Sequence, residues 1–597
     1  MLALDFETYY DDKLNVKILG PKRYIHDLLR LNHPPYLISL CNSEGDSYAG
    51  PLSEVDWNRF SVSKGIVAHN ASFDKAVYEG CVKADLVPVA GLGVPWRCTA
   101  DMAAFLHSPR SLKGAAKSLL GIDLKKDIRD NMKGKRFEDL TPEERREVTE
   151  YALKDAEVCL ALWAKYSNQW PDVEQQISEL NREIGLYGVA LDFQLVSKYK
   201  DALHLILFEA EKQLPWRNKD DGSEAKAVLS PTALAVTCRE HDIPCPSTVQ
   251  ENSPECEMWE EEYGDKFPWV DAMRRYRKAN GLLKKLITME QQSIDNILPF
   301  NLLYFGAHTG RFSGSNRMNL QNLPNRKASD TPLRRVIIPR PKHQLCVIDW
   351  AQIEPRVEYW MVKDRESLDA LRDGAQIYEL YARRHMGYTD PEPLKKKNPK
   401  LYGAAKASVL GLGYGCGANK FVIVAKALAD LDLTLEEAQQ QVNQYRSSNP
   451  RIVTMWNQLI FRARMHASRG EDYMLSLPSG RTLHYYNLKY SKTGKGSGLR
   501  ADVCMDGSRV AFLHGGKITE NWVQATARDV FALGLLRLRD NGFQNLFHVH
   551  DEYVLEIPTS CDRKETEKKI RRILLAPIPW LEGCPLDVTI DWRECYG

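Results

Sequence analysis

The spacing of apolar and polar positions predicts alternating strands and helices at the start of the chain. Short apolar runs at residues 2–6, 38–42 and 65–70 are typical of buried strands. Residues 100–107 and 150–166 show a helical period instead, and the second stretch is amphipathic over more than three turns. This alternation predicts a compact α/β domain that ends near Trp170 and Pro171.

The pattern changes after this domain. Residues 174–188 and 269–292 have the apolar period of long helices, and the second is also rich in basic residues. From about residue 301 there are glycine- and asparagine-rich loops, then an apolar strand at 345–350, helices from about 363 to 470, and another helix at 521–540. Two β-like runs flank residues 550–552, and the SKTGKGSG segment at 491–498 is predicted to be a loop. There is no internal repeat.

Composition narrows the class of protein. The chain has 597 residues, of which 43% are hydrophobic and 27% charged, as in globular proteins with several domains. No apolar run approaches the roughly 18 residues of a membrane span, and the first residues do not resemble a signal peptide, so we expect an intracellular protein without a membrane partner. The 13 cysteines include no CxxC pair, which indicates reduced thiols rather than disulfides or a zinc ribbon.

A net charge of +2 does not by itself indicate a nucleic-acid-binding protein. Basic residues nevertheless gather locally, and phosphate binding needs a basic stripe rather than a basic average. Each cluster on its own is more simply a solvated helix face, so together they only support DNA binding. The clusters are Arg274, Arg275, Arg277 and Lys278 with Lys284 and Lys285; Arg334 and Arg335; and Lys395, Lys396 and Lys397 with Lys400.

A first group of acids lies in the N-terminal domain. Asp5 and Glu7 end the first strand two residues apart, so their side chains leave the same face. Asp74 follows another predicted strand, and Asp155 lies one helical turn after Tyr151. Any one of these acids alone is more simply an N-cap or a surface charge. Together they have the oxygen ligands that Mg²⁺ prefers, and two such ions can activate water for attack on a phosphodiester.

A second group of acids lies in the C-terminal half. Asp349 ends the apolar strand, and Asp551 and Glu552 lie where apolar alternation on both sides predicts the tip of a hairpin. Between them, Lys406, Leu410 and Tyr414 recur every four residues, which predicts one face of a helix. A lysine beside an apolar or aromatic platform suits a nucleoside triphosphate, although an amphipathic helix with one snorkelling lysine has the same pattern.

The motifs of the first group resemble those of a known nuclease family. DFET, HNASFD and YALKD, in this order, are similar to the DEDD-type 3′→5′ exonucleases of the tyrosine-bearing branch. The resemblance implies an RNase H-like fold, with Asp5, Glu7, Asp74 and Asp155 as metal ligands. It also implies that Tyr151 orients the attacking water.

The second group resembles the family A (DNA polymerase I-like) polymerases through HTGRFSG with NLQNLP, DWAQIEPR, KASVLGLGYG and VHDE. The resemblance implies that Asp349 and Asp551 bind the catalytic metals, with Glu552 as an accessory. Glu354 would exclude ribonucleotides. The other implied nucleotide contacts are Lys406, Leu410, Tyr414, Gln352 and Arg326, and the implied primer-template contacts are Arg311, Gln321, Asn322, Arg326, Gln524 and His550. Two Mg²⁺ per active site are expected, with Mn²⁺ able to substitute.

The chain departs from this family pattern at two positions. Tyr402 stands where the family often has a triphosphate-contacting arginine, and Lys400 or Arg326 is the hypothesised replacement. Leu410 stands where many bacterial members have an aromatic ring and phage members often have leucine, which favours a bacteriophage source.

These resemblances together predict a domain order. An exonuclease domain at 1–171 would precede a right-hand polymerase with a thumb at 172–300, palm at 301–362 and 491–597, and fingers at 363–490. Because the chain begins at the exonuclease strand, no 5′-nuclease domain is expected, which favours a replication enzyme. Its partners would be primer-template DNA, dNTPs and replisome proteins such as helicase, primase or single-strand-binding protein. It would be a monomer in the cytoplasm, of a bacterial host if phage-encoded.

Other functions fit the sequence less well. A single-subunit RNA polymerase has similar catalytic residues, but Glu354 and the nuclease acids argue against it. A catalytically silent DNA-binding or scaffolding protein would not need every proposed metal ligand. The 491–498 segment does not match a phosphate-binding GxxxxGK[ST] loop, so a nucleotide-hydrolysing motor is rejected.

Overall fold

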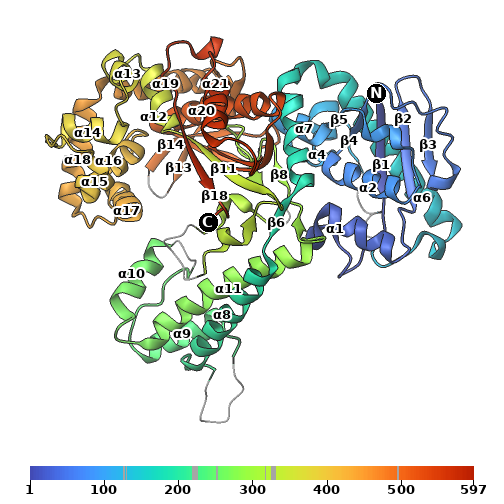
Figure 1. Cartoon of the computed structure of the whole chain (residues 1–597), viewed down its shortest axis with the longest axis horizontal. Coiled ribbons are helices and arrows are strands. Elements are labelled where there is room, and N and C mark those ends of the chain that lie inside the picture. The colour runs from blue at the N-terminus through green and yellow to red at the C-terminus, as the bar shows by residue number, and fades with distance from the viewer. Residues whose placement is uncertain are drawn as a thin grey trace. The chain divides into compact units, whose positions relative to one another are not determined.

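The structure, a computed structural model, is drawn in Figure 1 and divides into two compact units. It describes residues 1–124, 128, 131–217, 226–249, 253–315, 318–324, 331–493 and 496–597. The first unit comprises residues 1–188, 300–321 and 342–592, and the second comprises 189–299, 322–341 and 593–597. Both groups of acids belong to the first unit.

The N-terminal part of the first unit is built on a five-stranded sheet with the order β3-β2-β1-β4-β5. Strand β1 pairs antiparallel with β2 and parallel with β4, so the predicted strands are present. The elements are β1 (Leu2–Glu7), β2 (Leu37–Asn42), β3 (Ser47–Gly50), β4 (Ile66–Ala68), β5 (Trp96–Cys98), α1 (Val16–Arg30), α2 (Ala71–Lys83), α3 (Thr99–Phe105), α4 (Leu112–Ala115), α6 (Pro142–Tyr166) and α7 (Asp172–Tyr187).

The two faces of this sheet pack against different helices. Leu2, Leu4 and Phe6 of β1 are buried in one core cluster together with residues of α1 and α2. Ala3, on the opposite face, packs with Ala156 of α6. Because strand side chains alternate, Asp5 and Glu7 share the face of Ala3, which is the face that α6 covers.

A four-stranded sheet with the order β16-β17-β11-β18 holds the second group of acids. Its strands are β11 (His343–Trp350), β16 (Gln544–Val549), β17 (Glu552–Pro558) and β18 (Val588–Arg593). Asp349 of β11 lies opposite Glu552 of β17, and the main-chain N–H of Trp350 donates to the carbonyl of Asp551 at 3.2 Å. His550 turns the chain between β16 and β17 with a φ of 52°. The predicted hairpin with acids at its tip is confirmed.

Helices precede and follow a second antiparallel sheet between β11 and β16. The helices α13 to α18 lie together in Figure 1, drawn in yellow and orange. The elements are α12 (Ile353–Met361), α13 (Arg365–Arg372), α14 (Ile377–His385), α15 (Leu394–Lys397), α16 (Pro399–Ala407), α17 (Ala418–Ala429), α18 (Leu435–Ser448), α19 (Pro450–Ser468), β12 (Tyr473–Ser476), β13 (Thr482–Thr493), β14 (Gly496–Asp502), β15 (Val510–Leu513), α20 (Gly515–Asp540) and α21 (Arg563–Leu574).

Two sequence predictions in this region are wrong. The 491–498 segment is not a loop throughout, because β13 runs to Thr493 and β14 begins at Gly496. The strands continue because their pairing satisfies the backbone hydrogen bonds that glycine and serine composition does not reveal. The predicted single helical face is also interrupted: α16 ends at Ala407, and residues 408–412 form a π-helical turn before Tyr414. A fixed four-residue spacing cannot show such a change of helix type.

The second unit, in its described residues, combines a small sheet with four α-helices. Its strands pair in the order β10-β6-β7, and its core includes Trp216, Trp259 and Trp269. The elements are β6 (Val189–Leu191), α8 (Phe193–Lys212), α9 (Pro231–Glu240), α10 (Pro254–Tyr263), α11 (Pro268–Gln292), β7 (Ile297–Leu298) and β10 (Ile337–Ile338). None of the helices in the described ranges combines the length and apolarity of a membrane span.

Candidate active sites

The first group of acids meets where β1, α2 and α6 come together. Asp74 lies in the first turn of α2 and is buried. Its Oδ1 accepts the main-chain N–H of Phe6 at 3.3 Å, whereas its Oδ2 is buried without a hydrogen-bond partner among the described residues. Burial raises the pKa of Asp74 well above its ordinary value, and the charge of Glu7 raises it further.

Helix α6 brings Tyr151 and Asp155 to the same place. Burial raises the pKa of Tyr151, and so do Asp155, through charge and a hydrogen bond, and the charges of Glu7 and Asp5. Tyr151 interacts with Asp155, Glu7 and Asp5, and Glu7 also interacts with Asp74, so the five predicted residues lie near one another at the end of β1. The arrangement concentrates negative charge at one point, as a cation-binding site would.

The second group of acids meets at the tip of the β11 and β17 pair. Asp349 as a residue is exposed, yet the protein around its carboxylate excludes enough water to raise its pKa to about 7. The charges of Glu552 and Asp551 contribute in the same direction. Burial likewise raises the pKa of Asp551, and Arg311 opposes this shift. The two aspartates predicted from distant segments are therefore neighbours.

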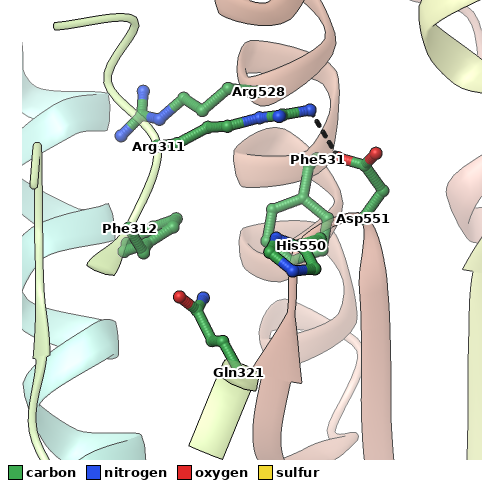
Figure 2. Close-up of a pocket in the computed structure, with 7 residues that line it drawn as sticks. All are labelled: Arg311, Phe312, Gln321, Arg528, Phe531, His550 and Asp551. Carbon is green, nitrogen blue, oxygen red and sulfur yellow. Dashed lines mark ion pairs between the residues drawn. The ribbon is translucent and has the colours of Figure 1, made fainter. Parts of the chain in front are cut away.

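Arg311 connects these acids to a second polar group. Its Nη2 forms an ion pair with Oε1 of Glu354. The same nitrogen lies 3.7 Å from Oδ1 of Asp551, as the dashed line in Figure 2 marks. The hydroxyl of Tyr414 donates to Oε2 of Glu354 at 3.0 Å. Glu354 thus uses both carboxylate oxygens, one for the guanidinium and one for the phenol. The three side chains form a fixed polar wall beside the aspartates.

A small pocket opens beside Asp551, and Figure 2 shows the side chains that line it. Arg528 and Phe531 extend from α20 into this region, and Gln321 lies across from His550 at the end of β16. The residues that line the pocket are Arg311, Phe312, Gln321, Arg528, Phe531, His550 and Asp551. Four of the predicted residues, Arg311, Gln321, His550 and Asp551, therefore share one pocket.

Sequence reasoning missed three of these residues, Phe312, Arg528 and Phe531. Arg528 is fully buried and pairs with Glu174 of α7 through two contacts of 2.6 and 3.0 Å. Its guanidinium also lies 5.6 Å from the ring centroid of Phe312. The two charged partners are far apart in the sequence, and a single arginine in an apolar helix carries no local signal of burial.

The other predicted contacts are not among the residues that line this pocket. Gln352 is the N-cap residue directly before α12, and its Oε1 accepts the N–H of Ile377 at 3.0 Å. Gln524 lies on α20 and donates to Glu520 at 3.3 Å. Lys406 is partly buried on α16, and Leu410 packs against the core of the surrounding helices.

Three further predictions concern positions that the site geometry does not include. Asn322 belongs to the second unit. Arg326 lies outside the described residues, so its proposed triphosphate contact has no structural description. Tyr402 packs edge-on against Tyr378, with ring centroids 5.5 Å apart, while Lys400 is exposed.

The carboxylates of both acid groups suit a hard divalent cation that takes its remaining ligands from the substrate. In the described part of the chain, no group of three or more His, Cys, Asp or Glu side chains is arranged to hold a metal ion by itself. Mg²⁺ in phosphoryl-transfer sites is commonly held by one or two carboxylates together with substrate phosphates and water. The raised pKa of Asp349 and the buried Oδ2 of Asp74 fit such an ion, because a bound cation would compensate for both.

Comparisons with known proteins agree on one family. The family model described as "DNA polymerase family A" matches residues 247–596. The DNA polymerase of Bacillus phage SP02 is 26% identical over 593 residues, covering 87% of each chain. The thermostable DNA polymerase I of Thermus thermophilus is 28% identical over 293 residues, which are 48% of this chain but only 31% of that enzyme.

A solved structure has the same fold over nearly the whole chain. It is the POL domain of Pol1 from M. smegmatis in a complex with DNA primer-template and dNTP. The TM-score is 0.68 at 18% sequence identity, with 94% of this chain and 93% of that chain covered.

Proposed function

Because the chain belongs to DNA polymerase family A, we propose that it extends a DNA primer by template-directed addition of deoxynucleotides. The observation that carries this proposal is the meeting of Asp349 and Asp551 beside the Arg311–Glu354–Tyr414 group. Phosphoryl transfer depends mainly on positioning of the reacting groups and on compensation of their charge. The two aspartates can hold the compensating cations, and the Arg311–Glu354–Tyr414 group can position the nucleotide.

Each residue has a proposed role in this reaction. Asp349 and Asp551 would hold divalent ions, Mg²⁺ by preference, which when bound favour ionisation of the primer 3′-hydroxyl and neutralise the departing pyrophosphate. Glu354, held between Arg311 and Tyr414, would occupy the space that a ribose 2′-hydroxyl needs. Lys406 would contact the triphosphate. The pocket residues Arg311, Gln321 and His550 would contact the primer-template terminus.

We also propose a 3′→5′ proofreading exonuclease in the N-terminal part. Its support is the gathering of Asp5, Glu7, Asp74 and Asp155 around Tyr151. The acids would hold two divalent ions at the phosphodiester, and Tyr151 would orient the attacking water. A mismatched primer end would be removed there before extension resumes.

The remaining proposals concern organisation and setting. The N-terminal sheet with α6 would be the nuclease and the β11–β17 sheet the palm. Residues 363–490, which include α13 to α19, would be the fingers, and residues 172–300, which include α8 and α11, the thumb. Primer-template DNA and dNTPs would be the substrates, because the structurally similar M. smegmatis protein binds a DNA primer-template and a dNTP in its complex. The similarity to a phage polymerase supports a role in phage DNA replication.

Primer extension with matched dNTP and rNTP mixtures tests the polymerase proposal. We expect extension with dNTPs in Mg²⁺, no extension when a chelator removes Mg²⁺, and strongly reduced use of rNTPs. Equal use of both nucleotides would instead identify an RNA polymerase. No extension under any condition would leave a DNA-binding protein without catalysis.

A further inference from the structure

Glu358 is a buried acid that the proposed mechanism does not use. It lies on α12 four residues after Glu354, so both side chains leave the same face of the helix. The residue is 2% exposed, and its Oε1 is buried without a hydrogen-bond partner among the described residues. A buried acid in this position needs an explanation, because a carboxyl oxygen buried without a hydrogen-bond partner destabilises the folded state.

The carboxyl of Glu358 packs against the segment that carries Tyr414, at Gly413. A Cβ built on Gly413 would lie 3.1 Å from Oε2 of Glu358, 2.8 Å from the carbonyl oxygen of Val409 and 3.5 Å from the hydroxyl of Tyr445. Three polar atoms thus surround the position that glycine leaves vacant. The carbonyl of Gly413 in turn accepts from Nε1 of Trp456 at 3.0 Å, which fixes the segment from the other side.

The charges around Glu358 favour its neutral form. Burial raises the pKa of Glu358 well above its ordinary value, and the Glu354 carboxylate raises it further. The other titratable groups that face it are the phenols of Tyr414, of Tyr445 on α18 and of Tyr359 on its own helix. A protonated carboxyl has one O–H donor, and the carbonyl and phenol oxygens near Gly413 are suitable acceptors.

We propose that Glu358 is a positioning residue for nucleotide selection: as a neutral acid beside Gly413, it holds the Tyr414 segment so that Tyr414 can bind Glu354. This inference rests on the proposed polymerase function and on the role of Glu354 against the 2′-hydroxyl. An ionised Glu358 would place a second carboxylate one turn from Glu354 and would weaken the Tyr414–Glu354 bond. An apolar residue would remove the hydrogen-bonding carboxyl from beside Gly413, where the carbonyl of Val409 accepts the N–H of Gly413 at 3.2 Å.

Two substitutions separate these possibilities. Glu358→Gln keeps the size, the neutral state and a hydrogen-bond donor. Glu358→Leu keeps a similar size but has no hydrogen-bonding group. We expect Glu358→Gln to keep the dNTP KM and the ratio of kcat/KM for dNTP over rNTP within about twofold of the parent chain. We expect Glu358→Leu to raise the dNTP KM and to lower this ratio about tenfold, with a much smaller change in kcat. These are the effects of a misplaced nucleotide pocket rather than of a lost catalytic group.

The experiment measures single-nucleotide incorporation between pH 6 and 8, with Glu556→Gln as the matched control. Glu556 is also a buried glutamate of the first unit, but its Oε2 accepts from Tyr187. We expect the control, the parent chain and Glu358→Gln to show the same dNTP-to-rNTP ratio at every pH. The ratio is used because general effects of pH on extension cancel in it.

Three results would overturn the inference. Glu358→Leu could match the parent chain, which would make Glu358 a space filler. Glu358→Gln could fail as Glu358→Leu does, which would require an ionised carboxylate. The parent ratio could titrate between pH 6 and 8 while that of Glu358→Gln does not, which would show that the acid ionises at neutral pH. Failure of the parent chain to extend a primer with dNTPs would refute the proposed function itself.

Discussion

The two groups of acids are held in different ways. In the N-terminal group, which we propose to be the nuclease site, Asp74 is positioned by the main-chain N–H of Phe6 within a short strand and helix arrangement. In the polymerase group, Asp551 lies beside the guanidinium of Arg311, which also binds Glu354, and Glu354 binds Tyr414. The carboxylate of Asp74 is thus held by the main chain, whereas that of Asp551 lies in a network of side chains from distant segments.

This difference has a chemical consequence. A site that removes a nucleotide from any 3′ end needs its acids in place but needs no recognition of the base or sugar. A site that selects one nucleotide needs a pocket of fixed shape, and side chains joined by charged hydrogen bonds make the surface of such a pocket rigid. We therefore expect side-chain substitutions around the acids to affect extension more than degradation.

The largest expected effect separates the two sites. Asp349→Ala or Asp551→Ala should abolish extension, because each removes a proposed metal ligand, while primer-template affinity and 3′-end degradation remain near normal. Asp5→Ala combined with Glu7→Ala should instead abolish 3′-end degradation and leave extension near normal. Extension and degradation of a labelled primer measure both. Unchanged synthesis in either single variant would refute the assignment of Asp349 and Asp551.

The next effect concerns the buried ion pair between α7 and α20. Glu174→Ala would leave the Arg528 guanidinium buried without its main partner and should lower the free energy of unfolding by about 3–5 kcal/mol. Denaturant unfolding measures this loss. Glu174→Gln is the control that keeps the shape and should cost less. If Glu174→Ala lowers the free energy of unfolding by less than about 1 kcal/mol, the ion pair does not stabilise the packing of α7 against α20.

A smaller effect tests the side-chain wall. Arg311→Ala should lower kcat/KM for dNTP incorporation on the order of a hundredfold, or about 2.7 kcal/mol, because Glu354 and Asp551 lose their shared cation. Arg311→Lys keeps the charge but lacks the planar guanidinium, so its kcat/KM for dNTP incorporation should lie between those of the parent chain and Arg311→Ala. Degradation rates should stay unchanged in both variants. Equal losses of extension and degradation would contradict the distinction between the sites.

The smallest effect, counted per unit of pH, concerns the free energy of unfolding. His548 is fully buried against Phe312, and burial lowers its pKa to about 3. Between about pH 6.5 and 3 the unfolded chain therefore binds a proton that the folded chain does not, so stability falls as pH falls, by about 1.4 kcal/mol per pH unit from this residue. His548→Gln should reduce the slope of unfolding free energy against pH by this amount. An unchanged slope would contradict the neutral, buried histidine.

The sequence predicted the elements better than their interactions. Strand alternation placed Asp5 and Glu7 on one face, and the apolar runs around Asp551 predicted the hairpin, because both signals are local. The π-helical turn before Tyr414 and the β13–β14 strands were not predicted, since both depend on packing and pairing with other segments. The Arg528–Glu174 pair joins residues in different parts of the chain, so no local pattern could indicate it.

The most direct test of two separate acid sites is a time course on a primer with a mismatched 3′ end, with dNTPs and Mg²⁺. We expect the parent chain first to shorten the primer and then to extend it to full length. Asp349→Ala should only shorten it, and Asp5→Ala with Glu7→Ala should not shorten it at all. Shortening that persists without Asp5 and Glu7, or extension that persists without Asp349, would contradict the assignment of two separate sites.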